Sequence, residues 1–448
     1  MNRLARACTA LFASAALLAG GGALAQEAPA PAAAAARVIG FDQAIEIALA
    51  QNDDLRQARN NAALGALDVA QARRDFVPDL RASAPSSRAF GREDGDTTRT
   101  ATAGLTSGVT LFNGFANTAT LAGAKSASAA DQADLARAGE TVVFTVATDF
   151  LALVQQREEL RVQRENLTAQ AALAAQIDTY VKAGARTIAD LYQQQSNVAS
   201  AQLAVVQAER AAELARIEII RTLRLDPRGT YEFVTPDIDK PGAIAHEPLD
   251  TLIQRAFATR ADIKASEARL EAARQDIRVA KSTRWPTVSL SAGYGSSYSS
   301  ADPAGWRDQF SDERGGSVGL NIALPLYDRD ATRIATRRAE IRADSAQIDL
   351  DTLEQEVGSQ VRTALLDLES AQAQLTAAEA QRAAAVRALE VTDQRYKVGA
   401  ATLVELTQSR ATQVEAASAA VAALYDVEFR RRLLAYHVGG LTPESVRI

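Results

Sequence analysis

The stretch YVKAGARTIADL at residues 180–191 returns as RYKVGAATLVEL at residues 395–406, and each copy lies between two long Ala-rich stretches. Both copies follow the pattern Lys-x-Gly-Ala-x-Thr-x-x-acid-Leu. Gly permits the positive φ at which a helix can stop and reverse, and Thr is a preferred N-cap for the returning helix. The sequence therefore predicts two equivalent helical hairpin tips. The shared positions are Lys182, Gly184, Thr187, Asp190 and Leu191, and Lys397, Gly399, Thr402, Glu405 and Leu406.

Long helices are predicted on both sides of each tip. No proline occurs between Pro85 and Pro227, or between Pro325 and Pro443, and these runs are rich in Ala, Gln, Leu and Glu. Helices over residues 113–181 and 330–398 would each span on the order of 100 Å. A seven-residue spacing, which favours left-handed coiled-coil packing, runs through both. Its positions are Val146, Leu153, Leu160, Leu167, Ala174 and Val181, then Val361, Leu368, Leu375, Arg382, Leu389 and Tyr396.

The whole arrangement is duplicated along the chain. A helix predicted over residues 41–76 ends before Pro78, and a second over 249–284 ends before Pro286. Each long helix can lie beside two shorter helices stacked end to end. Because the two shorter helices together match the length of the long one, the repeat would form a rod of even thickness. The shorter helices are 41–76 with 186–223 in the first repeat, and 249–284 with 402–438 in the second.

After each of these prolines the apolar residues alternate, which indicates β-strands. We expect four strands in two hairpins, with Gly-, Asp- and Ser-rich loops at 91–98 and 299–316. The alternating residues are Ala101, Ala103, Leu105, Val109 and Leu111 in the first hairpin, and Val318, Leu320, Ile322 and Leu324 in the second.

Four strands cannot close a barrel, and an open sheet edge is prohibitive in a bilayer. Outer-membrane barrels begin at about eight strands, so several copies must pool theirs: two copies would give eight strands and three would give twelve. Aromatic residues near the strand ends fit the interfacial belts of such a barrel. They are Phe112, Phe115, Trp285, Tyr294, Tyr298 and Tyr327.

The segment boundaries follow from these patterns. Residues 1–25 read as a secretory signal, with basic residues, an apolar run and the small-residue site Ala23-Leu24-Ala25. We expect a disordered leader at 26–40, a first repeat at 41–225, an equatorial linker at 226–248, a second repeat at 249–441 and a tail at 442–448. The single cysteine, Cys8, falls within the signal.

Composition argues against several functional classes. The formal net charge of −6 does not suit a nucleic-acid-binding protein. His246 and His437 lie far apart, and we find no clustered metal ligands, nucleophile elbow or phosphate loop. We therefore expect neither catalysis nor a cofactor.

Over residues 40–441 the chain resembles the TolC-type outer-membrane efflux and secretion channel family. The likeness rests on the two tips and on the strand-to-helix turns Leu111-Phe112-Asn113-Gly114-Phe115 and Leu326-Tyr327-Asp328-Arg329. It implies a mainly α-helical fold with an internal two-fold repeat, in which four strands per chain join a shared twelve-stranded barrel of a homotrimer. The barrel would contact outer-membrane lipid and continue into an α-helical coiled-coil tunnel across the periplasm of a Gram-negative bacterium.

The resemblance also implies partners and a gate. The tips would dock a periplasmic adaptor (membrane-fusion) protein that links the channel to an inner-membrane RND or ABC transporter, for efflux of small molecules or type I protein secretion. Polar links between tip helices would close the tunnel, one of them joining Asp190 to Tyr396. A second link in the family uses an Arg where this chain has Ala401. A ring of two acids per copy is reduced here to Glu405, with Gln408 in the other position.

A soluble periplasmic coiled-coil scaffold is the alternative. It would explain the helices but not the alternating strands at the same place in both repeats.

Overall fold

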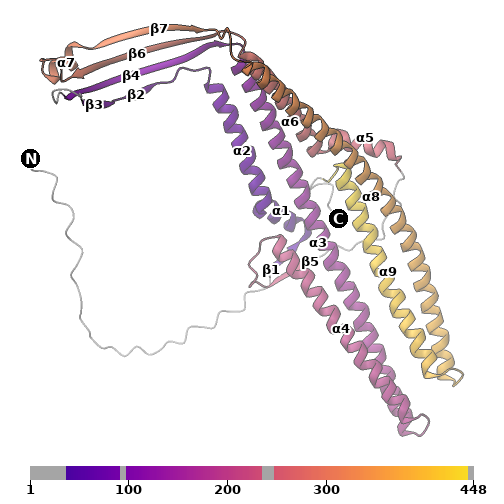
Figure 1. Ribbon diagram of the computed structural model, residues 1–448. Helices are drawn as coiled ribbons and strands as arrows, with labels where there is room; N and C mark the ends of the chain where they lie inside the picture. The colour runs from indigo at the N-terminus through magenta and orange to yellow at the C-terminus, as the bar shows by residue number, and fades with distance from the viewer. Residues whose placement is uncertain (1–36, 91–96, 235–246, 442–448) are drawn as a thin grey trace, which may run out of the picture.

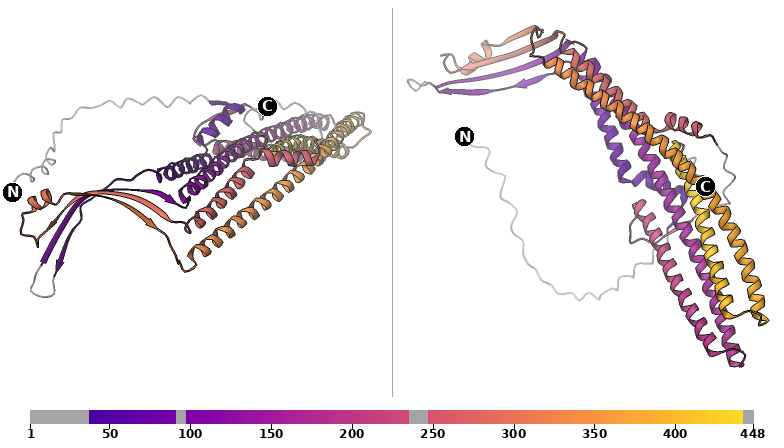
Figure 2. Two further views of the ribbon diagram at one scale, coloured as in Figure 1. Left: turned by 90° about the horizontal axis from the view of Figure 1, so that it is seen from above. Right: turned by 45° about the vertical axis from the view of Figure 1, so that its right-hand side comes forward.

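The computed structural model describes residues 37–90, 97–234 and 247–441, so the predicted signal, most of the leader and the tail lie outside it. A β-sheet forms one end of an elongated chain, and a long bundle of helices forms the rest (Figure 1). The two hairpin tips lie together at the end of the bundle farthest from the sheet (Figures 1 and 2).

Two helices of 67 residues each, α3 (Ala116–Lys182) and α8 (Ala331–Lys397), run the length of the bundle. On the sheet side, α2 (Asp53–Arg74) packs on α3 and α6 (Ala261–Ser282) packs on α8. On the tip side, α4 (Ile188–Thr222) packs on α3 and α9 (Leu403–Val438) packs on α8. The expected pairing of one long helix with two stacked shorter ones is confirmed in both repeats.

The helices predicted over residues 41–76 and 249–284 are each broken, which corrects the prediction of continuous helices. The first is divided into α1 (Phe41–Gln51) and α2, and the second into α5 (Leu249–Thr259) and α6. The breaks fall at Asn52 and Arg260, whose backbones are extended, with ψ of 130° and 128°. Asn52 caps α2 by accepting a hydrogen bond from the Leu55 amide, a role that its side chain favours.

The middle of the bundle holds the largest core. Residues 37–40, expected in the disordered leader, instead form strand β1 (Arg37–Gly40), which pairs in parallel with β5 (Tyr231–Val234) of the linker. Phe150 packs edge to face against Phe41 and Phe233, with ring centroids 5.3 and 5.8 Å apart. Ile39 and Phe233 are almost fully buried there, so the small sheet covers the core where the stacked helices meet.

The sheet is antiparallel, in the order β2–β4–β6–β7, with β3 also paired to β4. The first expected strand is interrupted into β2 (Arg81–Ser83) and β3 (Ser86–Phe90), separated by Ala84-Pro85. The others are β4 (Thr97–Asn113), β6 (Thr287–Ser299) and β7 (Gly315–Ala323). The loop expected at 299–316 contains a helix, α7 (Trp306–Asp312), because Gln309 bonds the carbonyls of Ser299 and Ala304 at 3.1 and 2.6 Å. The loop expected at 91–98 lies mostly outside the described residues, and its last two residues belong to β4.

The register gives the sheet one apolar and one polar face. Cross-strand partners point to the same side, and Val109, Leu290 and Leu320 form one such row. We call this side the apolar face; Val318, Leu320 and Ile322 on it are 78, 60 and 64 % exposed in the single chain. A bulge between Thr110 and Phe112 brings Phe112, rather than Leu111, onto this face beside Val288. The opposite, polar face carries Thr102, Thr106, Ser289, Ser291 and Asn321.

By length and composition alone, α3 could cross a membrane. Its apolar stretch includes Val143, Val146 and Leu153, which are 1 % exposed and belong to the mid-bundle core. Since 39 % of that stretch is buried, packing within the protein accounts for part of its apolar character.

Candidate functional site: the hairpin tips

Both tips have the same backbone geometry. Gly184 has a φ of 75° and Gly399 a φ of 77°, the left-handed conformation that ends a helix. At the first tip the Ala185 amide bonds the Tyr180 carbonyl at 2.8 Å, and at the second the Ala400 amide bonds the Arg395 carbonyl at 2.7 Å. These bonds satisfy carbonyls at the ends of α3 and α8 that the helices leave unpaired.

The returning helices begin with capping boxes. The Thr187 hydroxyl accepts from the Asp190 amide at 3.2 Å, and the Asp190 carboxylate accepts from the Thr187 amide at 3.3 Å. Thr402 and Glu405 repeat the arrangement at 3.2 and 3.0 Å. Both acids therefore hold a helix start in place and remain close to the tip surface.

The expected link between Asp190 and Tyr396 is not formed within the described part of this chain, where Asp190 bonds Thr187 instead. Tyr396 is 3 % exposed and its hydroxyl has no partner there. The Arg186 guanidinium lies 4.5 Å from the centre of the Tyr396 ring. Burial raises the pKa of Tyr396, against the opposing effect of the Arg186 charge, so the phenol stays protonated.

A small apolar core joins the two tips. Leu191 and Leu406 of the repeated motif are 8 % and 0 % exposed, and they pack with Ile177, Tyr396 and Leu403. Ala401 is buried in the same core, so the position where the family has an Arg holds a small apolar side chain here. Gln408 is exposed on the first turns of α9.

The exposed tip surface combines lysines with apolar side chains that sequence reasoning missed. Lys182 and Lys397 are exposed and pair with acids one turn earlier, Asp178 and Asp393, each at 2.6 Å. The apolar group is 53–80 % exposed and consists of Ile188, Tyr192, Val398 and Val404. For Ile188 and Val398 the available signal was their position directly beside the Thr187 cap and Gly399.

The strand-to-helix turns are built differently in the two repeats. Gly114 has a φ of 64°, and a side chain there would come within 2.5 Å of the Ser282 carbonyl oxygen. Phe112 packs edge to face on Phe115, with centroids 5.3 Å apart. In the second turn Asp328 caps α8 by accepting from the Thr332 amide at 2.8 Å. Tyr327 is 85 % exposed.

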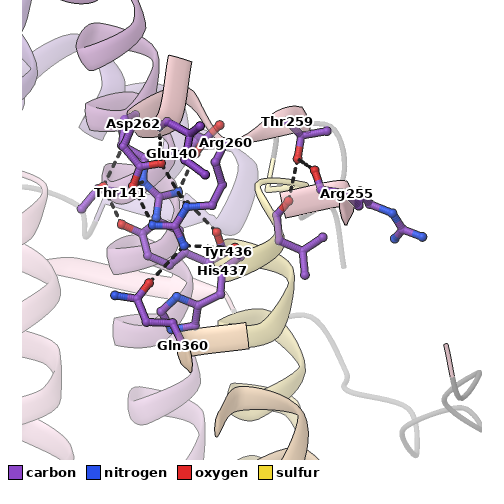
Figure 3. Close-up of polar contacts among 12 residues, drawn as sticks. Glu140, Thr141, Arg255, Thr259, Arg260, Asp262, Gln360, Tyr436 and His437 are labelled. Atoms are coloured by element: carbon purple, nitrogen blue, oxygen red, sulfur yellow. Dashed lines mark hydrogen bonds and ion pairs between the residues drawn. The ribbon is translucent and has the colours of Figure 1, made fainter. Parts of the chain in front are cut away.

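A buried polar cluster lies halfway along the bundle, where α5 and α6 meet the end of α9 (Figure 3). Arg260 is 3 % exposed and makes two bonds to the Asp262 carboxylate, at 2.6 and 3.0 Å. Its Nη1 also donates to the His437 carbonyl at 3.1 Å and to Gln360 Oε1 at 3.0 Å. One arginine thus connects the break in the second repeat to the end of α9.

Two further side chains hold the same helix end. Arg137 of α3 donates to the Tyr436 carbonyl at 3.3 Å and covers the Tyr436 ring at 3.9 Å. Thr259 donates to the Val438 carbonyl at 2.7 Å. Burial, and then the nearby charges of Arg260 and Arg137, lower the pKa of His437 to about 4, so the imidazole is neutral.

The described residues contain no candidate metal centre. Among them, no group of three His, Cys, Asp or Glu side chains could hold a metal ion. The helices form a long rod, and both hairpin tips, which are capped and partly apolar, lie at the same end of it.

The sequence profile described as outer membrane efflux protein matches residues 44–223 and 252–440. Protein CyaE of Bordetella pertussis is 30 % identical, over 88 % of this chain and 82 % of CyaE. Pyoverdine export outer membrane protein OpmQ of Pseudomonas aeruginosa is 25 % identical, over 85 % of this chain and 81 % of OpmQ.

Solved structures show the same fold. CusC superposes with a TM-score of 0.79 at 18 % identity, covering 89 % of this chain and 92 % of CusC. The outer-membrane channel OprN gives 0.77 at 22 % identity, covering 89 % and 90 %. The open state of the MtrE channel of Neisseria gonorrhoeae gives 0.75 at 21 %, covering 90 % of each chain.

Proposed function

Because the chain belongs to the outer membrane efflux protein family, and is therefore an outer-membrane protein, we propose that three copies form an exit duct across the outer membrane and periplasm. Residues 41–225 and 249–441 are then the two structural repeats of each copy. The twelve strands form one barrel, and the helices form a tunnel that ends at six tips.

The observation that carries this proposal is the open, two-faced sheet. One edge is formed by β2 and β3 and the other by β7, so both edges offer unpaired backbone groups. Such edges cannot remain open in a bilayer. The exposed apolar face suits lipid, and the polar face of Ser, Thr, Asn and Gly suits a water-filled lumen. Joining β7 of one copy to β2 and β3 of the next removes every edge.

Reconstitution tests the duct directly. The purified full chain should run as a trimer after chemical cross-linking in detergent, and should give discrete conductance steps in a planar bilayer. A soluble scaffold would be released from membranes by carbonate and would stay monodisperse without detergent. Release by carbonate together with absence of conductance would rule out the duct.

The tips are proposed to be the periplasmic gate. Asp190, Tyr396, Glu405 and Gln408 lie in or beside the two capping boxes, where three copies would converge. With Ala401 in place of an arginine, closure depends on apolar packing of the tip core and on the Arg186–Tyr396 contact more than on ion pairs. One carboxylate per copy, Glu405, is left to form a weak cation-binding ring.

The same tips are proposed to dock an adaptor protein. The docking surface consists of exposed residues around Gly184 and Gly399, with Lys182, Thr187, Lys397 and Thr402 at its edge; Leu191 and Leu406 support it from within. Tip substitutions Val398→Asp and Val404→Asp should abolish export in cells while leaving conductance intact. A matched change on the bundle, Leu366→Asp, separates docking from general misfolding. Export unaffected by both tip changes would place the adaptor elsewhere.

An inner-membrane RND or ABC transporter would supply the energy through that adaptor. The relative OpmQ is named for pyoverdine export, which makes efflux of small molecules the first cargo class to test. Type I secretion of a polypeptide remains the second. Deleting the chain should raise sensitivity to small toxic molecules in the first case, and retain a polypeptide in the cell in the second.

A further inference from the structure

A cavity of about 310 Å³ lies in the tip half of the bundle, where α9 packs between α3 and α8. Apolar side chains from all three helices line it, among them Val162, Val386, Leu389 and Val414. Ligand pockets of roughly 300–1,000 Å³ combine apolar walls with a few polar groups that fix the orientation of the ligand. The cavity has this composition, and it is formed within one copy, so it does not depend on the proposed trimer.

The charged groups around the cavity are mainly basic. Three arginines and one acid line it: Arg161, Arg382, Arg410 and Glu165. The Glu165 carboxylate already accepts a hydrogen bond from Arg161 Nη1 at 2.7 Å, and Arg161 Nε donates to Glu158 at 2.9 Å. In the described ranges of the chain, neither Arg382 nor Arg410 forms an ion pair. Two positive charges at the cavity are therefore left without an acid.

The Arg410 guanidinium is the more strongly shielded of these two groups. Its Nε and Nη1 are buried, and neither has a hydrogen-bond partner among the residues that the structure describes. Burial lowers the pKa of Arg410, against the opposing effect of the Asp393 charge. The Asp393 carboxylate itself pairs with Lys397 at 2.6 Å. Because a buried charge without an acceptor is costly, an anion in the cavity would stabilise this side chain.

The cavity lies behind the residues that we place at the gate. Successive residues of a helix are about 100° apart, so Arg410 projects from α9 about 170° away from the midpoint between Glu405 and Gln408. Glu405 and Gln408 are exposed, whereas Arg410 faces side chains of α3 and α8 across the cavity. A ligand here would therefore be separate from the cation-binding ring proposed for Glu405, and opposite to it in charge preference.

We propose that this cavity binds a small organic carboxylate. The carboxylate oxygens accept hydrogen bonds from the Arg410 guanidinium, and the exposed Arg382 adds a second positive charge nearby. The apolar part of the ligand contacts Val386, Leu389 and Val414. This assignment goes beyond the proposed duct, because neither conduction nor docking of an adaptor requires a bound anion on this side of α9.

Fluorine NMR titration of the purified full chain in detergent tests the site. The probes are 4-fluorobenzoate and its uncharged match, 4-fluorobenzamide, and the signal change with empty micelles is subtracted. 4-Fluorobenzoate should bind at least about tenfold more tightly, because hydrogen bonds between ionised groups are stronger than neutral ones. Arg410→Gln should remove this preference. Equal binding of the two probes by the unaltered chain would overturn the proposal.

Arg387→Gln is the matched control for charge. Arg387 lies on α8 next to Val386 and is exposed, but it is not one of the side chains that line the cavity. Its loss should leave the preference for 4-fluorobenzoate unchanged. An equal loss of preference in Arg387→Gln and Arg410→Gln would reduce the effect to the overall charge of the bundle and would reject the site.

Inorganic phosphate separates an organic ligand from a simple anion. It has no apolar part that could contact Val386 and Leu389, so it should bind at least about fivefold more weakly than 4-fluorobenzoate. Its affinity is measured by its ability to displace the fluorinated probe. Equal affinity would show that the apolar walls contribute nothing, and would contradict the assignment to an organic carboxylate.

Thermal unfolding without any ligand gives an independent measurement. Arg410→Met removes an unpaired charge from a buried position and keeps an unbranched side chain there, so it should unfold at a higher temperature than the unaltered chain. Unfolding at a lower temperature would show that the guanidinium already has an acceptor in the free chain, and would overturn the proposal.

Discussion

Glycine is required at the two tips by backbone conformation and not by crowding. A side chain at Gly184 or Gly399 would meet nothing within 4 Å, yet both residues have φ near 75°. Gly184→Ala should lower the free energy of unfolding by about 1 kcal/mol. Guanidinium unfolding in detergent measures this change. Gly358→Ala is the control: it also has open space but lies inside α8, so it should stabilise by about 0.5–1 kcal/mol.

His437 makes stability depend on pH. Its pKa of about 4 in the fold is below the ordinary value of 6.5, so the unfolded chain binds more protons between these values. The free energy of unfolding should therefore fall as pH drops from 6.5 towards 4. Because the ring is only half-buried, we expect a loss of about 1 kcal/mol between pH 6.5 and 5.

Thermal unfolding at several pH values checks this effect. His437→Gln should remove the change between pH 6.5 and 5. His246→Gln, at the other histidine of the chain, should keep it. The groups facing His437 come from α3, α6 and α8 and from the break at residue 260, namely Arg137, Asp262, Gln360 and Arg260. Persistence of the change in His437→Gln would show that a different group titrates in this range, because the two arginines stay charged, the Gln360 amide does not titrate and the pKa of Asp262 is lowered.

At the scale of elements, residue patterns predicted the long helices and the tips, because proline spacing and capping chemistry are local. The breaks at Asn52 and Arg260 depend on tertiary packing. Asn52 is a preferred N-cap residue and precedes two acids, so the sequence could have predicted a new helix start there. Arg260 is not a preferred cap residue, and its neighbours in the sequence do not predict a break. Its extended backbone places the guanidinium against the end of α9, a contact 177 residues away. Likewise, β1 pairs with the distant strand β5 and buries Ile39 in the mid-bundle core.

Arg260 should therefore be among the most sensitive positions of the helical elements. Arg260→Gln leaves the half-buried Asp262 carboxylate with the Arg137 guanidinium, at 3.6 Å, and the Ile263 amide, at 3.0 Å, and frees the His437 carbonyl. We expect a loss of about 3 kcal/mol on guanidinium unfolding. Arg255→Gln breaks the ion pair with Glu247, whose side chains are 46 and 41 % exposed, and should cost less than about 1 kcal/mol. Equal losses would show that the cluster contributes no more than a surface pair.

The charge of Glu405, in the first turn of α9, should affect how the channel binds cations. Glu405→Gln keeps an oxygen that can accept from the Thr402 amide, so the capping box should persist while the charge is lost. Block of single-channel current by divalent cations should weaken severalfold. Gln408→Glu, one turn along the same helix, should strengthen it. Unchanged block in both variants would exclude a carboxylate ring at this level.

At the scale of the whole molecule, the two long sides of the chain carry exposed apolar side chains on opposite edges. Across the bundle the order is α2, α3, α6, α8 near the sheet and α4, α3, α9, α8 near the tips (Figure 1). On the α8 side, Ile334, Ile341 and Ile348 recur every seven residues and are 48–57 % exposed. On the opposite side, Leu64 and Leu67 of α2 are 59 and 64 % exposed. The edges differ from each other, so contact between copies in the proposed trimer would be head to tail, and such contacts close a ring only at a fixed rotation.

If copies meet along these edges, assembly should depend on the exposed isoleucines of α8, Ile334, Ile341 and Ile348, which we call the α8 seam. Ile341→Glu places a charge among apolar side chains that the next copy must cover, and should convert the trimer largely to monomer in detergent. Ile341→Val keeps the seam apolar and should leave the trimer intact, which separates the effect of charge from that of size. Light scattering in detergent and loss of bilayer conductance report the two outcomes. A stable, conducting trimer of Ile341→Glu would show that α8 faces water or lipid in the assembly, and would require a different pair of edges to close the ring.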